Sequence, residues 1–129
     1  MKQRIDEPIA GFTLIELLVV LAIVAVLLTL AVPRYHGQLE SAKEAVLRDN
    51  LRTTRELIDK FYADTGRYPE TLDELVERRY LRARPIDPLT ESSETWILVP
   101  PSAGYAGAVQ NVKSGAKGVA RDGRAFVEW

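Results

Sequence analysis

The most constraining feature of this 129-residue sequence is a long apolar segment near its start. Between Leu17 and Val32 the only polar residue is Thr29, and the apolar character extends back to Phe12. At a rise of 1.5 Å per residue, a helix over 12–32 would be about 32 Å long, close to the thickness of the hydrocarbon core of a bilayer. Since the segment is apolar on every face, it predicts a membrane-spanning helix rather than a surface helix.

Two other interpretations of this segment stay open. The first is the buried core helix of a soluble protein, although a core as small as the residues after Pro33 can build rarely encloses such a helix. The second is the apolar region of a cleaved secretory signal, which is usually about 7–15 residues long and ends at a small-x-small site. The stretch Thr29–Ala31 matches such a site only weakly.

Composition excludes several kinds of chemistry. The absence of cysteine rules out disulfides and thiolate sites, and a single histidine argues against a histidine zinc site or a histidine-dependent triad. The formal net charge of −1 gives no sign of nucleic-acid binding. Between residues 12 and 33 the only charged side chain is Glu16. Because a carboxylate in a membrane helix is costly, Glu16 is a functional candidate that needs a partner.

The remaining candidates for catalysis are weak. Asp73 with Glu74 and Asp87 with Glu91 form carboxylate pairs, but helix capping and solvation explain them better than acid–base chemistry. No serine has an obvious base, and the sequence lacks a phosphate-binding loop. We therefore expect a protein that is not an enzyme and has no catalytic residues.

The segment Gly11–Glu16, GFTLIE, stands directly before the apolar run and resembles the signature of the type IV prepilin family. This family comprises type IV pilins and the pseudopilins of type II secretion systems. The resemblance implies that a prepilin peptidase removes the leader 1–11 by cleaving between Gly11 and Phe12, and that Phe12 becomes N-methylphenylalanine. It also implies that the helix over 12–33 packs into the core of a helical filament.

Glu16 has a physical role in this interpretation. Cleavage creates an amine on Phe12, and in a helical array the amine of one subunit can offset the Glu16 carboxylate of its neighbour. Such a pair would set the axial register between subunits, as a buried polar residue does in a coiled coil. The alternative is a carboxylate that only reaches the headgroups near the end of the helix.

The sequence after Pro33 predicts that the helix continues in water. Pro33 removes one backbone hydrogen bond and is expected to kink the helix. Over 34–64 the pattern is amphipathic, so one face is expected to cover a sheet of the same chain. This apolar stripe consists of Leu47, Leu51, Thr54, Ile58 and Phe61, widened by Val46 and Leu57.

Residues 65–129 are predicted to form a globular head. Gly66 is expected to end the long helix in a left-handed conformation, and Thr71 with Glu74 forms a capping-box pattern before a short helix near 72–79. Strand patterns separated by glycine- and proline-rich turns favour an antiparallel sheet covered by the long helix, an α+β, pilin-like fold. The three predicted strands are Thr95–Val99, Ala108–Val112 and Arg124–Trp129.

The head resembles that of a type II secretion pseudopilin of the major type more than that of a pilus pilin. Many pilus pilins close a C-terminal loop with a disulfide, which this chain cannot form. The resemblance also implies calcium in an acidic C-terminal loop, but the loop 113–123, KSGAKGVARDG, contains Asp122 as its only acid. Ca²⁺ prefers about six to eight oxygen ligands, so we place no calcium site and expect no cofactor.

We interpret the chain as a structural subunit of a periplasmic pseudopilus that drives protein export. The implied partners are copies of the chain, other pseudopilins, the prepilin peptidase, an inner-membrane assembly platform and membrane lipid, with no nucleic acid. The chain would cross the inner membrane once with its head in the periplasm, in agreement with Lys2 and Arg4 on the inner side. The alternatives are a type IV pilus or DNA-uptake minor pilin, a signal-anchored membrane binding protein, and a secreted domain.

Overall fold

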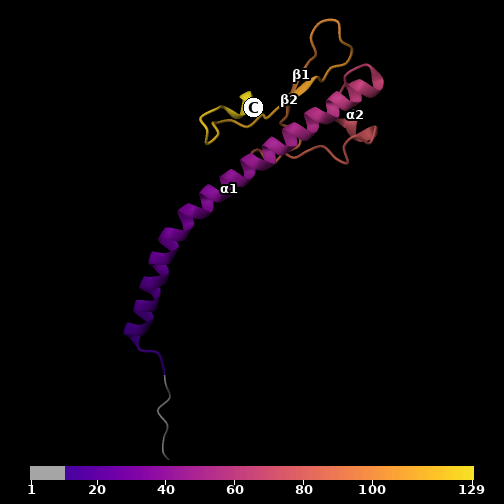
Figure 1. Ribbon diagram of the computed structural model, residues 1–129. Helices are drawn as coiled ribbons and strands as arrows, with labels where there is room; N and C mark the ends of the chain where they lie inside the picture. The colour runs from indigo at the N-terminus through magenta and orange to yellow at the C-terminus, as the bar shows by residue number, and fades with distance from the viewer. Residues whose placement is uncertain (1–10) are drawn as a thin grey trace, which may run out of the picture. The chain divides into compact units, whose positions relative to one another are not determined.

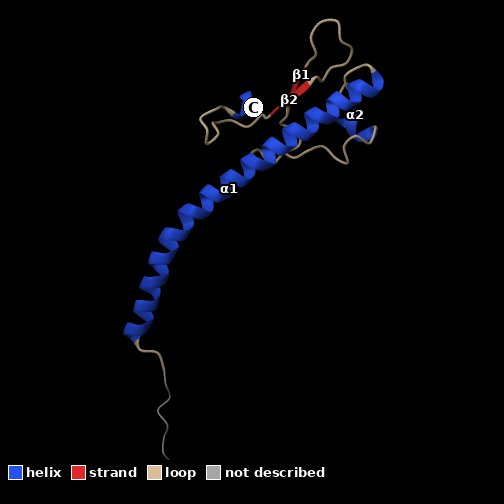
Figure 2. Ribbon diagram, in the orientation of Figure 1, coloured by secondary structure: helices blue, strands red, loops and turns tan. Residues whose placement is uncertain are grey.

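The computed structural model describes residues 11–129, so the predicted leader lies outside the described residues except for Gly11. The chain divides into two compact units, one that ends at Gln38 and one over Leu39–Trp129. In chain order the elements are α1 (Leu14–Thr65), α2 (Leu72–Glu77), β1 (Ile97–Val99), β2 (Asn111–Lys113) and a 3-10 helix, η1 (Phe126–Glu128) (Figures 1 and 2).

Helix α1 starts at a threonine cap. The Thr13 hydroxyl accepts a hydrogen bond from the Glu16 N–H at 3.1 Å, and the Thr13 carbonyl accepts one from the Leu17 N–H, also at 3.1 Å. The first bond satisfies an N–H group that has no backbone partner within the helix, and the second is the first regular bond of the helix. The helix then continues through Pro33 without interruption, and the kink expected there stays a prediction.

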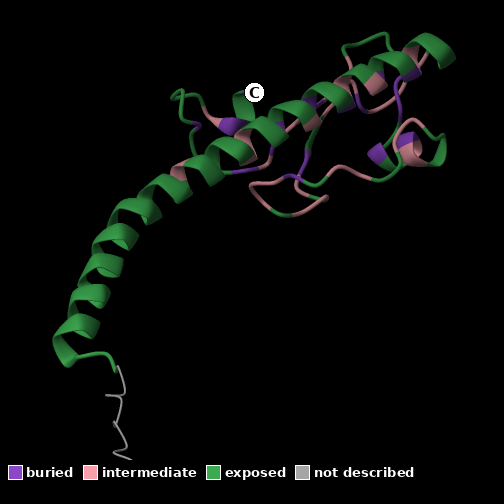
Figure 3. Ribbon diagram, turned by 60° about the horizontal axis from the view of Figure 1, so that its bottom comes forward, coloured by how far each residue is buried: buried purple, intermediate pink, exposed green. Residues whose placement is uncertain are grey.

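The described residues of the first unit form no buried interior. Every residue from Gly11 to His36 is exposed, and Figure 3 shows this part of α1 in the colour of exposed residues throughout. Its apolar side chains are therefore covered by no other described part of the chain. The second unit, in contrast, buries its own apolar core.

The part of α1 in the second unit supplies one wall of that core. The five buried residues of α1 are the predicted stripe of Leu47, Leu51, Thr54, Ile58 and Phe61, which confirms the helical period read from the sequence. Of the two positions expected to widen the stripe, Leu57 is half-buried and Val46 is 49% exposed, so the stripe is narrower than predicted. The core is completed by apolar residues from the rest of the head, among them Leu72, Leu75, Val109, Val112 and Phe126.

The connection between the two helices follows the predicted chemistry in most respects. Gly66 has φ +77° and its N–H donates to the Tyr62 carbonyl at 2.8 Å, which confirms the left-handed end of α1. The Thr71 hydroxyl accepts from the Glu74 N–H at 3.2 Å, so Thr71 caps α2. The reciprocal bond of a capping box is displaced by one residue, because Glu74 Oε2 accepts from the Glu70 N–H at 2.7 Å.

Two strands form the sheet in the described part of the chain, instead of the three predicted. Strands β1 and β2 are antiparallel, with Leu98 opposite Val112, and both are shorter than the predicted segments. Val112 is buried and faces the core, whereas Ile97 and Leu98 of β1 are exposed. The antiparallel arrangement and the covering helix are as expected for an α+β fold.

The prediction of a third strand over Arg124–Trp129 was wrong. Ala125 forms a single isolated bridge with Val119, and the chain then turns into η1. The physical reason is the spacing of the two large aromatics. Phe126 and Trp129 are three residues apart, so a strand would point them to opposite faces, whereas a helical turn points both into the core. Their rings meet edge to face at 5.3 Å between centroids.

Candidate functional site

The predicted processing residues lie just outside the first turn of α1. Gly11 and Phe12 precede the helix, and Phe12 is 87% exposed. Among residues 11–129, nothing lies within 4 Å of where a Cβ at Gly11 would stand. The described part of the chain therefore does not cover the bond between Gly11 and Phe12.

Glu16 sits in the first turn of α1, where its carboxylate faces the positive end of the helix dipole. The side chain is exposed, and among residues 11–129 no ion pair involves it. Its neighbours along the helix are apolar and exposed, including Ile15 at 74% and Leu17 at 51%. The carboxylate thus lies in the first turn of α1 beside an apolar surface, where a cation from another molecule can reach it.

The apolar surface itself is the largest feature of the first unit. An 18-residue window of α1 has a mean hydropathy of 3.0 and none of it is buried. The exposure of its large side chains ranges from 44% at Val24 to 76% at Leu14. Exposed apolar area of this extent marks a surface that contacts lipid or other proteins. By length and composition the helix can cross a membrane.

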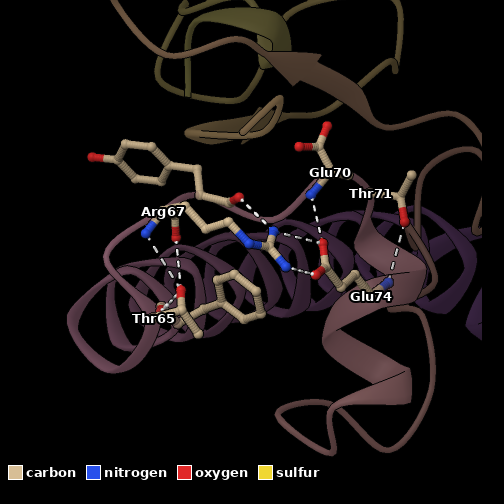
Figure 4. Close-up of polar contacts among 7 residues, drawn as sticks. Thr65, Arg67, Glu70, Thr71 and Glu74 are labelled. Atoms are coloured by element: carbon tan, nitrogen blue, oxygen red, sulfur yellow. Dashed lines mark hydrogen bonds and ion pairs between the residues drawn. The ribbon is translucent and has the colours of Figure 1, made fainter. Parts of the chain in front are cut away.

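In the head, the described charged groups hold the fold together. Arg67 and Glu74 form a two-pronged ion pair, with Arg67 Nη1 at 3.2 Å from Glu74 Oε2 and Nη2 bonded to Oε1 (Figure 4). The guanidinium also lies 5.1 Å from the centroid of the Phe61 ring. The hydrogen bond from Arg67 lowers the pKa of Glu74 below its ordinary value. This cluster joins the end of α1 to the start of α2.

Asp87 forms a second polar cluster, which lies inside the head. The residue is fully buried, and its Oδ1 accepts from the Leu89 N–H at 2.8 Å. Its Oδ2 accepts from the Ser114 hydroxyl at 2.5 Å, and Ser114 Oγ in turn accepts from the Ala116 N–H at 3.1 Å. Asp87 thereby joins the turn after α2 to the chain that follows β2.

Arg55 anchors the far side of the helix. Its guanidinium donates to Asn111 Oδ1 at 2.7 Å, to the Val112 carbonyl at 2.9 Å and to the Trp129 carbonyl at 2.6 Å. Burial lowers its pKa from the ordinary value. Sequence reasoning missed this role, although the position carried a signal. Arg55 follows Leu51 by four residues and precedes Ile58 by three, so a charge there lies beside the buried stripe.

None of the carboxylate pairs has the setting of an acid–base site. Glu74 is paired with Arg67, Asp73 lies 3.4 Å from Arg84, and Asp87 is closed off from solvent. Trp96 and Trp129 belong to the hydrophobic core. Within the described residues, no group of three or more histidine, aspartate or glutamate side chains is placed to hold a metal ion.

In the head, a hollow of about 380 Å³ lies beside α1 and opens to solvent. Its lining includes Arg48, Arg52, Arg55, Arg124 and Trp129. It contains carboxylates and guanidinium groups but no histidine, serine or threonine that a hydrolytic mechanism would use.

Comparison with known proteins agrees with the motif and extends it to the head. Residues 9–32 match the family described as a prokaryotic N-terminal methylation motif. The type II secretion system core protein G of Klebsiella pneumoniae is 31% identical, over 92% of this chain and 93% of its own length. That of Escherichia coli (strain K12) is 30% identical, over 89% of this chain and 87% of its own.

The chain belongs to the type II secretion system core protein G family. The core protein G of Pseudomonas aeruginosa is also 30% identical, over 61% of this chain and 67% of its own length. The predicted resemblance to the type IV pilin-like proteins, and among them to a major-type pseudopilin, is confirmed. The pilus-pilin and membrane-binding-protein alternatives gain no support from these core protein G relatives. No solved structure matches the chain.

Proposed function

We propose that this chain is a non-catalytic structural subunit of a periplasmic pseudopilus in a type II secretion system. It assembles with copies of itself and with other pseudopilins through the helix over 12–33. The observation that carries this proposal is that no residue is buried in the apolar part of α1 that follows the GFTLIE motif. Because the head already has a complete core, this surface is left for contacts with lipid and with other subunits.

Maturation comes first in this proposal. A prepilin peptidase cleaves between Gly11 and Phe12 and the new N-terminus is methylated. The exposed position of both residues before the first helical turn supports this step, because a peptidase needs extended and accessible backbone.

Before assembly, the helix over 12–33 spans the inner membrane and the head lies in the periplasm. The hydropathy and length of the helix support the span, and Lys2 and Arg4 support the orientation. An inner-membrane assembly platform then moves the subunit into the filament, where apolar contacts between subunits replace contacts with lipid. The kink proposed at Pro33 marks the end of this segment, which 34–64 continues as the helix of the head.

Within the filament, Glu16 pairs with the amine on Phe12 of a neighbouring subunit. Two observations support the pairing: Glu16 carries the only charge between residues 12 and 33, and it has no ion pair of its own among the described residues. Burying either charge alone between subunits would cost several kcal/mol, so the pair favours the one axial register that brings both charges together.

The decisive experiment compares Glu16→Ala with Glu56→Ala, which alters an exposed acid on the same helix in the head. Both variants should insert and be cleaved after Gly11, as shown by mass spectrometry of the mature N-terminus. Filament yield should fall at least tenfold for Glu16→Ala only, since an unpaired amine is then left between subunits. Because the chain has no cysteine, disulfide cross-linking between two cysteines introduced on opposite sides of a subunit contact measures assembly without background.

Two results would count against the proposal. Cleavage at a bond other than Gly11–Phe12 would remove the basis for the paired amine. Normal filament yield from Glu16→Ala would show that the carboxylate has no part in register and only reaches the headgroups.

A further inference from the structure

The loop 113–123 is where the family resemblance implies a calcium ion. Calcium prefers about six to eight oxygens, with several carboxylates among them. Here Asp122 is the only acid in the loop, while Lys113, Lys117 and Arg121 add positive charge. No metal-binding group of three acidic or histidine side chains exists among residues 11–129. The donor set of this loop therefore does not fit calcium.

The one carboxylate of the loop already has cationic partners. Asp122 Oδ1 accepts from the Arg124 backbone N–H at 3.0 Å, and Oδ2 accepts from Arg124 Nε at 3.0 Å. Arg48 Nη2, which comes from α1, lies 3.6 Å from the same Oδ2. The backbone N–H and then the guanidinium of Arg124 lower the pKa of Asp122. Both carboxylate oxygens are thus engaged by nitrogen donors.

Helix α1 meets the loop with one group of each charge. The Glu44 Oε1 accepts from the Arg121 backbone N–H at 3.0 Å. One turn later, Arg48 reaches Asp122, and its guanidinium carbon lies 4.4 Å from the centroid of the Trp129 ring. An acid on the helix therefore faces a donor of the loop, and a base on the helix faces the acid of the loop.

The loop also closes on itself through its backbone. The Ala120 N–H donates to the Arg124 carbonyl at 2.8 Å, and the Gly123 N–H donates to the Ala120 carbonyl at 3.0 Å. Ala120 is buried, and Phe126 follows it into the core. A turn closed by these bonds leaves the charged side chains to fix the loop against α1.

We infer that arginine–carboxylate pairs centred on Asp122 fasten the loop 113–123 to α1, and that the head folds without calcium. The resemblance to major-type pseudopilins implies a metal ion in this loop, and here the ion pairs take its place. The inference concerns the single subunit and holds whether or not the filament proposal is correct. It also predicts what loosens the loop. Salt should weaken the attachment of the loop to α1, because salt screens exposed ion pairs, whereas chelators should have no effect on it.

Limited trypsin digestion of the full chain in detergent tests the inference. The reporter is the rate of cleavage after Lys117, an exposed loop residue, followed by mass spectrometry. This bond is chosen because cleavage after Arg121 would be altered directly by changing its neighbour Asp122. The rate should be the same in EGTA and in about 1 mM calcium chloride, a concentration that fills weak extracellular calcium sites.

Two variants test the ion pairs. Asp122→Asn and Arg48→Gln should each speed cleavage after Lys117 by about two- to fivefold, as expected from the loss of exposed pairs. High salt should speed cleavage of the unaltered chain in the same way and have less effect on the variants. The control is Asp49→Asn, which removes an exposed α1 pair, Asp49 with Arg52 at 2.7 Å, and should leave the rate unchanged.

The inference would be overturned if EGTA speeds cleavage of the unaltered chain or calcium slows it, since a metal would then hold the loop. It would also be overturned if neither Asp122→Asn nor Arg48→Gln changes the rate. Circular dichroism identifies a variant that fails to fold, and in that case the other variant and the salt series decide. Filament assembly is not measured, so failure of the proposed function leaves these readouts untouched.

Discussion

Three acidic side chains of the head differ in how deeply they are buried, and we expect their contributions to the stability of the fold to differ in the same order. Asp87 is fully buried and bonded to the backbone and to Ser114, Glu74 is partly buried against Arg67, and Asp122 is exposed between two arginines. Removing a buried acceptor leaves donors without partners, whereas an exposed pair is screened by water and salt. We therefore expect the loss of the acidic group to have a large effect on stability at Asp87, an intermediate effect at Glu74 and a small effect at Asp122.

Replacing Asp87 with alanine should lower the free energy of unfolding by about 2–3 kcal/mol, because the Leu89 N–H and the Ser114 hydroxyl lose their buried acceptor. Urea denaturation followed by circular dichroism measures the change. The matched control is Asp73→Ala, an exposed acid 3.4 Å from Arg84, which should change stability by less than about 1 kcal/mol. Equal losses from the two variants would mean that burial of Asp87 is not what makes it important.

Acid should weaken the head partly through Glu74. Because Arg67 lowers the pKa of Glu74, the folded state binds this proton less readily than the unfolded state does. The contribution to stability is therefore present above the ordinary value of 4.5 and is lost as the pH falls through the lowered pKa. The free energy of unfolding, measured from pH 6 to pH 2, should depend less on pH for Glu74→Gln than for the unaltered chain. Arg67→Gln should also reduce the pH dependence in this acidic range. An unchanged acid dependence in Glu74→Gln would contradict the assignment.

At the scale of the elements, the sequence predicted burial well in the long helix and poorly in the last segment of the chain. The stripe on α1 was predictable because only a 3.6-residue period decides which of its side chains are buried. The conformation of Arg124–Trp129 was not predictable in this way. The alternating sequence pattern suggested a strand, but it cannot show that both Phe126 and Trp129 pack into the same core. A local pattern places Arg55 beside the buried stripe. Its partner Asn111 and the Ser114 partner of Asp87 lie more than 20 positions away in the chain, and no local pattern identifies these partners.

The turn between the helices gives a test of backbone conformation alone. Gly66 has φ +77°, and a Cβ there would meet nothing within 4 Å, so Gly66→Ala should cost about 1 kcal/mol from the backbone alone. Gly107 has φ +104°, and a Cβ there would come within 2.2 Å of the Tyr68 carbonyl oxygen. Gly107→Ala should therefore cost clearly more, because the backbones must also move apart. Thermal unfolding by circular dichroism ranks the two, and the reverse order would refute this reasoning.

At the scale of the whole molecule, the two units solve the problem of apolar surface differently. The second unit buries an apolar core within itself, whereas the apolar residues of the first unit that the structure describes are all exposed. The Gly11–Glu16 motif was predictable because it lies in one contiguous segment, and the family match over residues 9–32 includes it. What surrounds the apolar helix in a filament was not, since those contacts belong to other chains.

This division predicts that a fragment over residues 39–129 folds in water without detergent, since every residue of the hydrophobic core lies within it. Light scattering after size-exclusion chromatography should show a monomer, and urea should unfold it in one cooperative transition. The full chain should aggregate when detergent is removed, because its exposed helix then contacts water. A fragment that is unfolded in water would mean that the head depends on residues before Leu39.

The two buried indoles give this protein a pair of built-in optical reporters. The Trp96 N–H donates to the Pro85 carbonyl at 2.8 Å. The Trp129 N–H is buried without an acceptor among residues 11–129, and its ring lies under Arg48. The two rings should therefore emit at different wavelengths, with Trp129 the bluer of the two. Loosening of the final turn would redden the Trp129 signal while leaving Trp96 unchanged, so emission colour can separate local fraying from global melting.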